Sequence, residues 1–209
     1  MRQQESIRLF KSPVLEALTH VHPMVPLMIW GPVVVLLIAL SVRHQLDGLG
    51  ILGMVAAGVL LWTAAEYFLH RYVFHFVPKG PLKGFQERVV YLIHGIHHDQ
   101  PEDATRLVMP PAASVGLGIL FYLLFRAIFG EQWVMPFFAG FLAGYLCYDY
   151  AHYAIHHFLP KNRVLKYLKN HHMKHHYMTH GARWGVSSPL WDILCGTMKE
   201  RVSGERRGA

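Results

Sequence analysis

The sequence predicts an all-α fold: a four-span helical membrane domain with a cytoplasmic, histidine-rich helical cap. Hydrophobic residues make up 53% of the 209 residues and charged residues only 16%, which is typical of a chain that spans a membrane. Four apolar stretches are long enough to cross a bilayer, and ten of the 16 histidines fall into four clusters beside their ends. The length suits one domain over residues 1–209.

The four apolar stretches cover residues 24–42, 49–69, 107–129 and 133–151. Each provides roughly the 20 residues that a helix needs to cross the hydrocarbon layer. The links between the first two stretches and between the last two are short, so we expect two helical hairpins. This arrangement places the N-terminus, the connection 70–106 and everything after residue 151 on one side of the membrane.

The basic residues assign the two sides of this arrangement. Of the 20 Lys and Arg residues, 18 lie on the side of the N-terminus, and only Arg43 and Arg126 lie near the other surface. Because cytoplasmic segments are rich in Lys and Arg, we expect both termini and the histidine clusters to be cytoplasmic. The net charge of +7 then reflects membrane orientation, and no motif indicates a nucleic-acid partner. Such a multi-pass protein suits a plasma or inner membrane or the endoplasmic reticulum, and its basic tail, 201–209, is expected to be disordered.

All the histidine clusters lie on that cytoplasmic side. Positions i, i+3 and i+4 of a helix share one face, so each of the two His-x-x-His-His motifs can point three imidazoles together. His70 and His75 diverge by about 140° on a regular helix, so we expect the helix to end or bulge between them, or the two imidazoles to approach the metals from different directions. Ten imidazoles suit two five-coordinate metal ions. The clustered residues are His70, His75, His94, His97, His98, His152, His156, His172, His175 and His176.

The residue types narrow the chemistry of these ions without choosing one metal. Neutral imidazole is a good ligand for Zn, Fe, Cu and Ni. A purely structural zinc ion would need only four ligands. Open coordination positions beside a membrane favour redox chemistry on an apolar substrate, and iron with O2 is the natural candidate for attack on an unactivated C–H bond.

Five segments around these histidines carry a resemblance to a known family: EYFLHRYVFH, HGIHHDQPEDATRLVMPP, YDYAHYAIHH, NHHMKHHY and WGVSSPLWD. Over about residues 60–200 the chain resembles the fatty acid 2-hydroxylase branch of the sterol desaturase and fatty acid hydroxylase superfamily. The resemblance implies that all ten clustered histidines bind two metal ions in a four-span membrane domain. It also implies a non-haem diiron monooxygenase that uses O2 to hydroxylate carbon 2 of a long acyl chain, presented as a free acid, a thioester or a sphingolipid.

The same resemblance implies the cofactors and partners. The native ions would be two Fe ions, which Zn could replace on overexpression, and the partners would be a long-chain acyl lipid and the surrounding membrane lipids. Eukaryotic members often carry a fused haem-binding cytochrome domain, for which this chain has no room. Its His22–Pro23 pair also lacks the Gly-Gly turn of that domain's haem motif. We therefore expect electrons to come from a separate protein.

Several polar residues beside the motifs are expected to support the site without binding metal. Metal-bound imidazoles usually donate their second N–H to an acceptor, and Glu66 and Asp149 are placed to accept it. Helix capping or solvation is the expected role of Asp99, Asp103 and Asp192. His171 precedes His172 by one position and points about 100° away, so it should contact a ligand or lie at the surface.

The remaining candidates are side chains that could line a substrate site. His157 follows His156 and could donate a hydrogen bond near the metals, and His180 could line the substrate mouth. Trp184 and Trp191 could form the walls of an acyl pocket, although tryptophans at a membrane interface are also common.

Two other functions fit parts of the pattern. A carotenoid or sterol hydroxylase or desaturase of the same superfamily would share the histidine motifs. A histidine-rich membrane metal carrier would place some histidines or acidic residues inside the spans as a pathway. The middle of each predicted span has none, which counts against a carrier.

Overall fold

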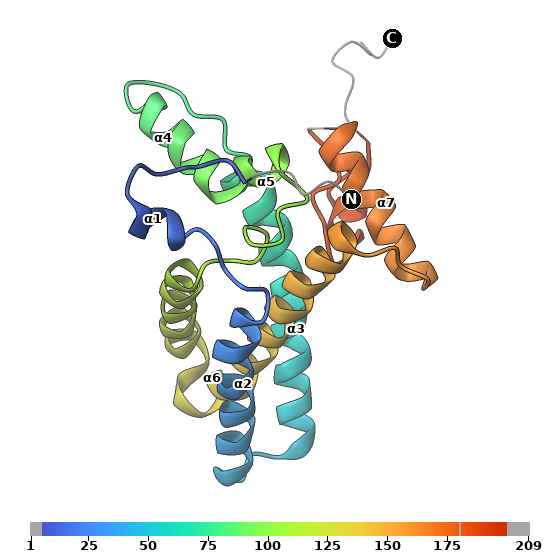
Figure 1. Cartoon of the computed structure of the whole chain (residues 1–209). Helices are drawn as coiled ribbons and strands as arrows, with labels where there is room; N and C mark the ends of the chain where they lie inside the picture. The colour runs from blue at the N-terminus through green and yellow to red at the C-terminus, as the bar shows by residue number, and fades with distance from the viewer. Residues whose placement is uncertain (1–5, 180, 200–209) are drawn as a thin grey trace.

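The computed structural model describes residues 6–179 and 181–199, and this part of the chain is helical without any strand. The predicted all-α fold is therefore confirmed, whereas the predicted disorder of 201–209 concerns residues outside the described part. Three long helices run side by side, and the short helices gather at one end of them (Figure 1). The elements in chain order are α1 (Pro13–Ala17), α2 (Val25–Arg43), α3 (Gly48–Leu69), η1 (His70–Phe74), α4 (Lys83–Val90), η2 (Tyr91–Gly95), α5 (Ile96–Asp99), α6 (Pro111–His157), α7 (Arg163–Tyr177) and α8 (Leu190–Leu194).

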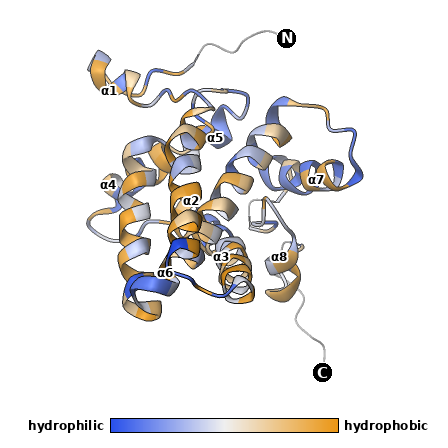
Figure 2. Ribbon diagram, turned by 90° about the horizontal axis from the view of Figure 1, so that it is seen from below, coloured by the Kyte–Doolittle hydropathy of each residue, from blue (hydrophilic) through white to orange (hydrophobic). Residues whose placement is uncertain are grey.

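Three helical segments of the described chain are long and apolar enough to cross a membrane: Val25–Arg43, Gly48–Phe74 and Pro111–His157. Their outward faces carry large apolar side chains, and Met28 and Val35 are each 69% exposed. Hydrophobic residues cover much of α2, α3 and α6, while α7 is largely hydrophilic (Figure 2). Exposed aliphatic side chains of this kind are suited to contact with lipid rather than water.

The sequence predicts two separate spans, 107–129 and 133–151, where the structure has the single element α6. Its backbone leaves the helical conformation only at Gly130, whose φ of 73° lies in the left-handed region that glycine favours. The two arms fold back on each other, since the rings of Phe121 and Phe141 lie 5.0 Å apart, as do those of Phe125 and Phe137. Element α6 thus consists of two helical arms joined at Gly130, where the chain reverses.

The backbones of α3 and α6 touch at a pair of glycines. A Cβ atom on Gly58 would overlap the carbonyl oxygen of Phe137, and one on Gly140 would overlap the carbonyl oxygen of Val55. Small residues at a helix crossing permit this close approach in membrane proteins. The contact sets how far α3 and the second arm of α6 extend toward the short helices.

We expect Gly58→Ala to separate these helices and to lower the free energy of unfolding by about 1–3 kcal/mol. Gly53 on the same helix has open space around its Cα, so Gly53→Ala should be neutral or stabilising by up to about 1 kcal/mol. Thermal unfolding of both variants in the same detergent tests the contact. Equal melting temperatures for the two variants would show that the close approach contributes nothing.

Candidate metal centre

A local change of helix type places the first two clustered histidines. The last turn of α3 widens into the π-helix η1, and the His75 N–H donates to the His70 carbonyl five residues earlier, at 3.2 Å. A π-turn rotates successive residues less than an α-turn, so positions i and i+5 come to one side. The predicted bulge between these two histidines is therefore confirmed.

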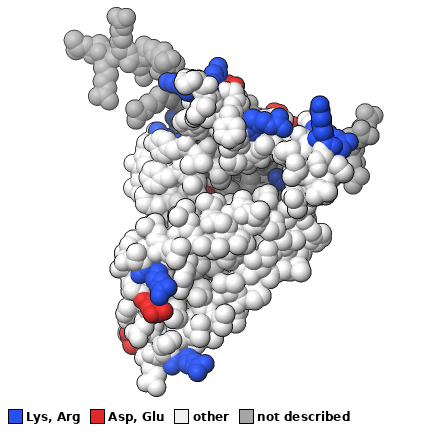
Figure 3. All heavy atoms as spheres, turned by 90° about the vertical axis from the view of Figure 1, so that its left-hand side faces the viewer, with Lys and Arg blue, Asp and Glu red and all other residues white. Residues whose placement is uncertain are grey.

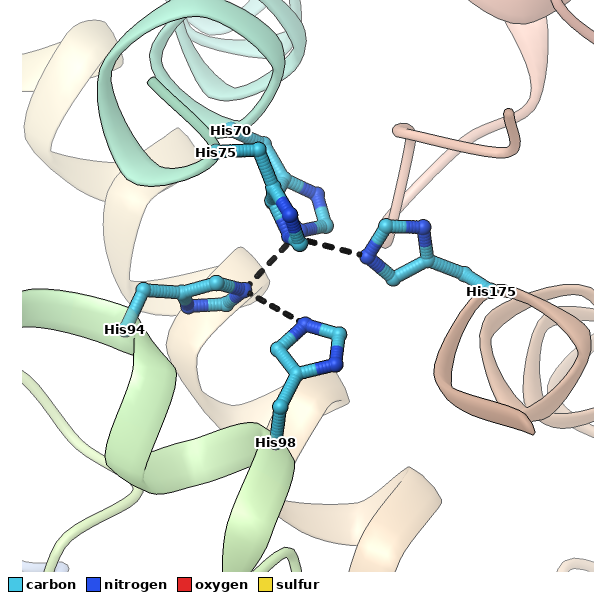
Figure 4. A group of neighbouring side chains, drawn as sticks. All are labelled: His70, His75, His94, His98 and His175. Carbon is cyan, nitrogen blue, oxygen red and sulfur yellow. Dashed lines mark hydrogen bonds between the residues drawn. The ribbon is translucent and has the colours of Figure 1, made fainter. Parts of the chain in front are cut away.

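The structure brings all ten clustered histidines together, in two groups of five. Within each group the facing ring nitrogens lie within 4.8 Å of one another. We call the first group site A; in Figure 4 its imidazoles point toward one another from three parts of the chain. Site A consists of His70, His75, His94, His98 and His175. We call the second group site B; it consists of His97, His152, His156, His172 and His176.

Each His-x-x-His-His motif is divided between the two sites, which corrects the prediction that its three imidazoles point together. His94 and His98 belong to site A, whereas His97 belongs to site B. The second motif is divided in the opposite sense, because it gives His172 and His176 to site B and His175 to site A. On a helix the i and i+4 side chains lie about 40° apart, but i+3 and i+4 lie about 100° apart. Each motif can therefore face two neighbouring centres.

The nitrogen positions in site B fit a shared cation better than hydrogen bonds. His172 Nε2 lies 2.9 Å from His152 Nε2, 3.0 Å from His156 Nε2 and 3.0 Å from His176 Nε2. One imidazole nitrogen carries at most one proton, so it cannot donate three hydrogen bonds. Adjacent ligands at right angles on an ion with bonds of about 2.1 Å would stand about 3.0 Å apart.

Burial keeps these imidazoles neutral, as metal ligands must be. Removal from water lowers the pKa of His94, His97 and His172 well below the ordinary value, and neighbouring imidazoles lower it further. His97 Nε2 is buried, and no hydrogen-bond partner reaches it within the described residues. An ion in site B would satisfy that atom, so the donor set fits a metal centre.

Two backbone carbonyls orient imidazoles of site A. His70 Nδ1 lies 2.5 Å from the Trp184 carbonyl oxygen, and His175 Nδ1 lies 2.9 Å from that of Ala182. Since a carbonyl only accepts, each Nδ1 must carry the proton and donate it. The unprotonated Nε2 atoms then face the other imidazoles, which is the tautomer that binds a metal.

Glu66 supports the site through this carbonyl-bearing loop rather than through a histidine. Its buried carboxylate accepts the N–H groups of Val186 at 2.6 Å and Ser187 at 2.8 Å, and the Ser187 hydroxyl. The prediction that Glu66 accepts from a clustered imidazole is therefore wrong: its donors belong to Val186 and Ser187. Asp149 likewise accepts from the Tyr145 hydroxyl, at 3.2 Å, and from a backbone N–H, with no imidazole partner in the described chain.

Asp192 is the supporting residue that the sequence reading placed wrongly. The sequence predicts helix capping or solvation for Asp192, but its side chain is fully buried and accepts from the His171 Nε2–H at 3.0 Å. It also accepts from the N–H groups of Trp184 and Gly185 and the Thr197 hydroxyl. Burial alone would raise the pKa of Asp192, but these hydrogen bonds outweigh it and hold the pKa below its ordinary value.

The other predicted neighbours lie outside both groups of five. His171 is buried and contacts Asp192. Of the two predicted positions, next to a ligand or at the surface, the surface position is therefore wrong. The His157 ring packs at a tilt against Tyr153, with ring centres 4.4 Å apart. His180 lies outside the described residues.

An apolar cavity of about 410 Å³ reaches both sites. His94 of site A and His97 and His152 of site B border it, and most of the other lining residues are apolar. Neither of the tryptophans proposed as pocket walls lines it: Trp184 packs on the histidine rings of site A, and Trp191 donates to the Thr63 hydroxyl. The space-filling view shows a recess between an uncharged belt and an end rich in Lys and Arg (Figure 3).

The N-terminal segment forms one wall of this cavity, a role that the sequence reading missed. Buried Arg106 donates to the carboxylate of Glu16, and the Val21 N–H donates to the Thr105 carbonyl at 2.7 Å. These bonds hold the N-terminal segment against the residues that follow α5. The residues of the N-terminal segment that line the cavity are Leu9, Phe10, Leu18 and Thr19. The only available signal was Arg106, a cation inside the otherwise apolar RLVMPP stretch, which requires a buried partner.

Fold and site together define a helical protein with membrane-length apolar helices and a histidine-rich centre that could hold metal ions. A family model described as fatty acid hydroxylase matches residues 55–197. Because this match covers well over half of the 209 residues, the chain belongs to the fatty acid hydroxylase family. The resemblance derived from the histidine segments is confirmed.

Named relatives and one solved structure agree with this assignment. The dihydroceramide fatty acyl 2-hydroxylase FAH1 of Arabidopsis thaliana is 38% identical over 195 residues, which cover 93% of this chain and 81% of that protein. The human fatty acid 2-hydroxylase is 38% identical over 70% of this chain and 39% of its own length. A solved structure described as full-length scs7p, with only the hydroxylase domain visible, has a TM-score of 0.85 at 38% identity, covering 90% of this chain and 70% of that one.

Two buried histidines with similar exposure test the assignment of ligands. His97 is 5% exposed and His171 is 3% exposed, but only His97 lies in a group of five. We expect His97→Ala to lose bound metal and all activity. His171→Ala should keep its metal and lose about 10–100-fold in activity, as when a group that supports a ligand is removed. Metal analysis by mass spectrometry distinguishes them, and equal metal loss would add His171 to the ligand set.

Proposed function

We propose that this chain is an O2-dependent hydroxylase that acts on carbon 2 of long-chain acyl groups through two metal ions, natively iron. One observation carries the proposal: two groups of five imidazoles, each buried or partly buried, border the same apolar cavity. Membership of the fatty acid hydroxylase family supports the reaction type. All ten clustered histidines would hold the ions, five to each site.

The reaction inserts one oxygen atom into a C–H bond. One atom of O2 becomes the hydroxyl group on carbon 2, and the other leaves as water with two protons and two electrons. Bound iron would supply the oxygen activation that no amino-acid side chain provides. The electrons would come from a separate donor protein.

The contribution of the chain is to position the substrate and to exclude water. Carbon 2 lies next to the polar head of an acyl lipid, so the head must lie at the histidine end of the cavity. Apart from the histidines, the polar lining residues are Thr19, Arg106, Tyr148 and Asp149, and the remaining apolar lining suits the tail. A bound tail would displace water from the cavity and hold its second carbon beside His94, His97 and His152.

The form of the substrate follows from the relatives' names rather than from the site. The Arabidopsis relative is named a dihydroceramide fatty acyl 2-hydroxylase. The Saccharomyces cerevisiae relative SCS7 is named a ceramide very long chain fatty acid hydroxylase; it is 39% identical, and the match covers 88% of this chain and 47% of that protein. A sphingolipid-linked acyl group is therefore the first form to test, before a free acid or a thioester. A carotenoid or sterol oxidase or desaturase remains the alternative within the superfamily. A metal carrier is disfavoured, because in the described spans the acidic and histidine side chains lie near the ends.

We further propose that four segments cross the membrane and that both termini and both metal sites face the cytoplasm. The two arms of α6 would be the third and fourth segments. The distribution of Lys and Arg supports this orientation.

Lipid mass spectrometry tests the proposed reaction. Cells that express the chain with a suitable electron donor should accumulate 2-hydroxylated acyl lipids, and His97→Ala cells should not, because site B would lose its ion. Purified protein should hold two metal ions per chain. Metal-loaded, folded protein that forms no 2-hydroxy product from any of the three substrate forms would refute the proposal.

Cysteine labelling tests the proposed orientation. With native Cys147 and Cys195 replaced by Ser, a cysteine at Gln45 should react from outside intact cells and one at Lys161 only after permeabilisation. Both positions are exposed, so both should be labelled once the membrane is opened. Labelling of both from the same side would contradict the two-hairpin arrangement.

A further inference from the structure

A second, smaller cavity lies directly beyond the apolar cavity that borders the metal sites. It measures about 30 Å³, which is space for little more than a water molecule. Leu69, Met109 and Leu117 line both cavities, so these three side chains form the partition between them. The small cavity is otherwise bordered mainly by rings, among them Trp30 and Phe121.

Helix geometry shows that the small cavity continues the large one away from the histidines. On the first arm of α6, Ala113 lines the large cavity, Leu117 both, and Phe121 the small one. Residues four apart share a face and advance about 6 Å along the axis. On the second arm, His152 borders the large cavity and Phe141 the small one, and these positions, 11 apart in the sequence, are separated by about 16 Å along the helix.

The far end of this path is formed by aromatic side chains. The Trp30 ring packs directly over Gly118, where even a Cβ atom would overlap it, and its Nε1–H donates to the Ser114 hydroxyl at 3.3 Å. This bond fixes the orientation of the indole. The Phe121 ring meets Phe141, with ring centres 5.0 Å apart. The path thus ends in a wall held by both arms of α6 and by α2.

We propose that Leu117 and the wall of Trp30 and Phe121 set the longest acyl chain that this protein accepts. This inference rests on the proposed function, because it takes carbon 2 to lie beside the histidines. A chain anchored there extends along α6 and first meets the Leu117 partition. Longer chains must displace that side chain to enter the small cavity, and their ends then meet the ring wall.

Competition among straight-chain substrates that lengthen by two carbons at a time tests the proposal. Leu117→Trp fills the partition, so the ratio of kcat/KM for the longest to the shortest accepted substrate should fall at least about 10-fold. Phe121→Ala removes part of the wall and should shift the ratio the opposite way. This second variant keeps the test decisive if Leu117→Trp does not fold.

Leu123→Trp is the matched control, because it makes the same change on the same arm. Leu123 is 55% exposed and lines neither cavity, so the length profile should stay as in the wild type. An unchanged ratio in both Leu117→Trp and Phe121→Ala, with active wild-type protein, overturns the inference alone. Wild-type protein that hydroxylates no acyl chain of any length overturns the proposed function instead.

Discussion

The close contact between α3 and α6 is the constraint on which the metal centre depends. Gly58 and Gly140 let the two backbones touch, and each glycine precedes a clustered histidine by twelve residues. His70 and His152 therefore both lie about 18 Å beyond the contact, at the same level of the bundle. Gly144, whose missing side chain makes room for Trp62, keeps the same register one turn further on. Two helices that slid past each other by one turn would no longer present these imidazoles to a common region.

Above that contact, buried hydrogen bonds join the short helices to the bundle. Glu66 holds the backbone at Val186 and Ser187, and the same loop places a carbonyl against His70. Asp192 connects that loop to His171 on α7. A buried carboxylate with every partner in place rigidifies its surroundings, whereas one that loses a partner is costly. The positions of the imidazoles thus depend on two carboxylates that contact none of the clustered histidines in the described structure.

The membership of the centre could be predicted from sequence, but its internal arrangement could not. The clustered histidines are recognisable as four motifs in the sequence, and the i, i+5 spacing of His70 and His75 required the bulge that η1 provides. Spacing fixes the angle between side chains on one helix, yet not which neighbour each faces, so the division of the His94 motif stayed hidden. Asp192 lies in the short helix LWDIL, where no sequence pattern marks a buried carboxylate, and only the tertiary fold buries it. The wall made by residues 6–21 has no periodic pattern to reveal it.

The opposite division of the two motifs has a thermodynamic consequence. The segment η2–α5 supplies two imidazoles to site A and one to site B. Helix α7 supplies one imidazole to site A and two to site B. If each site binds an ion as proposed, an ion that orders either segment at one site would also order a ligand of the other, so occupancy of the two sites would be linked, and the linkage would be reciprocal. Loading would accordingly be cooperative, and chains that carry a single ion would be scarce even when metal is limiting.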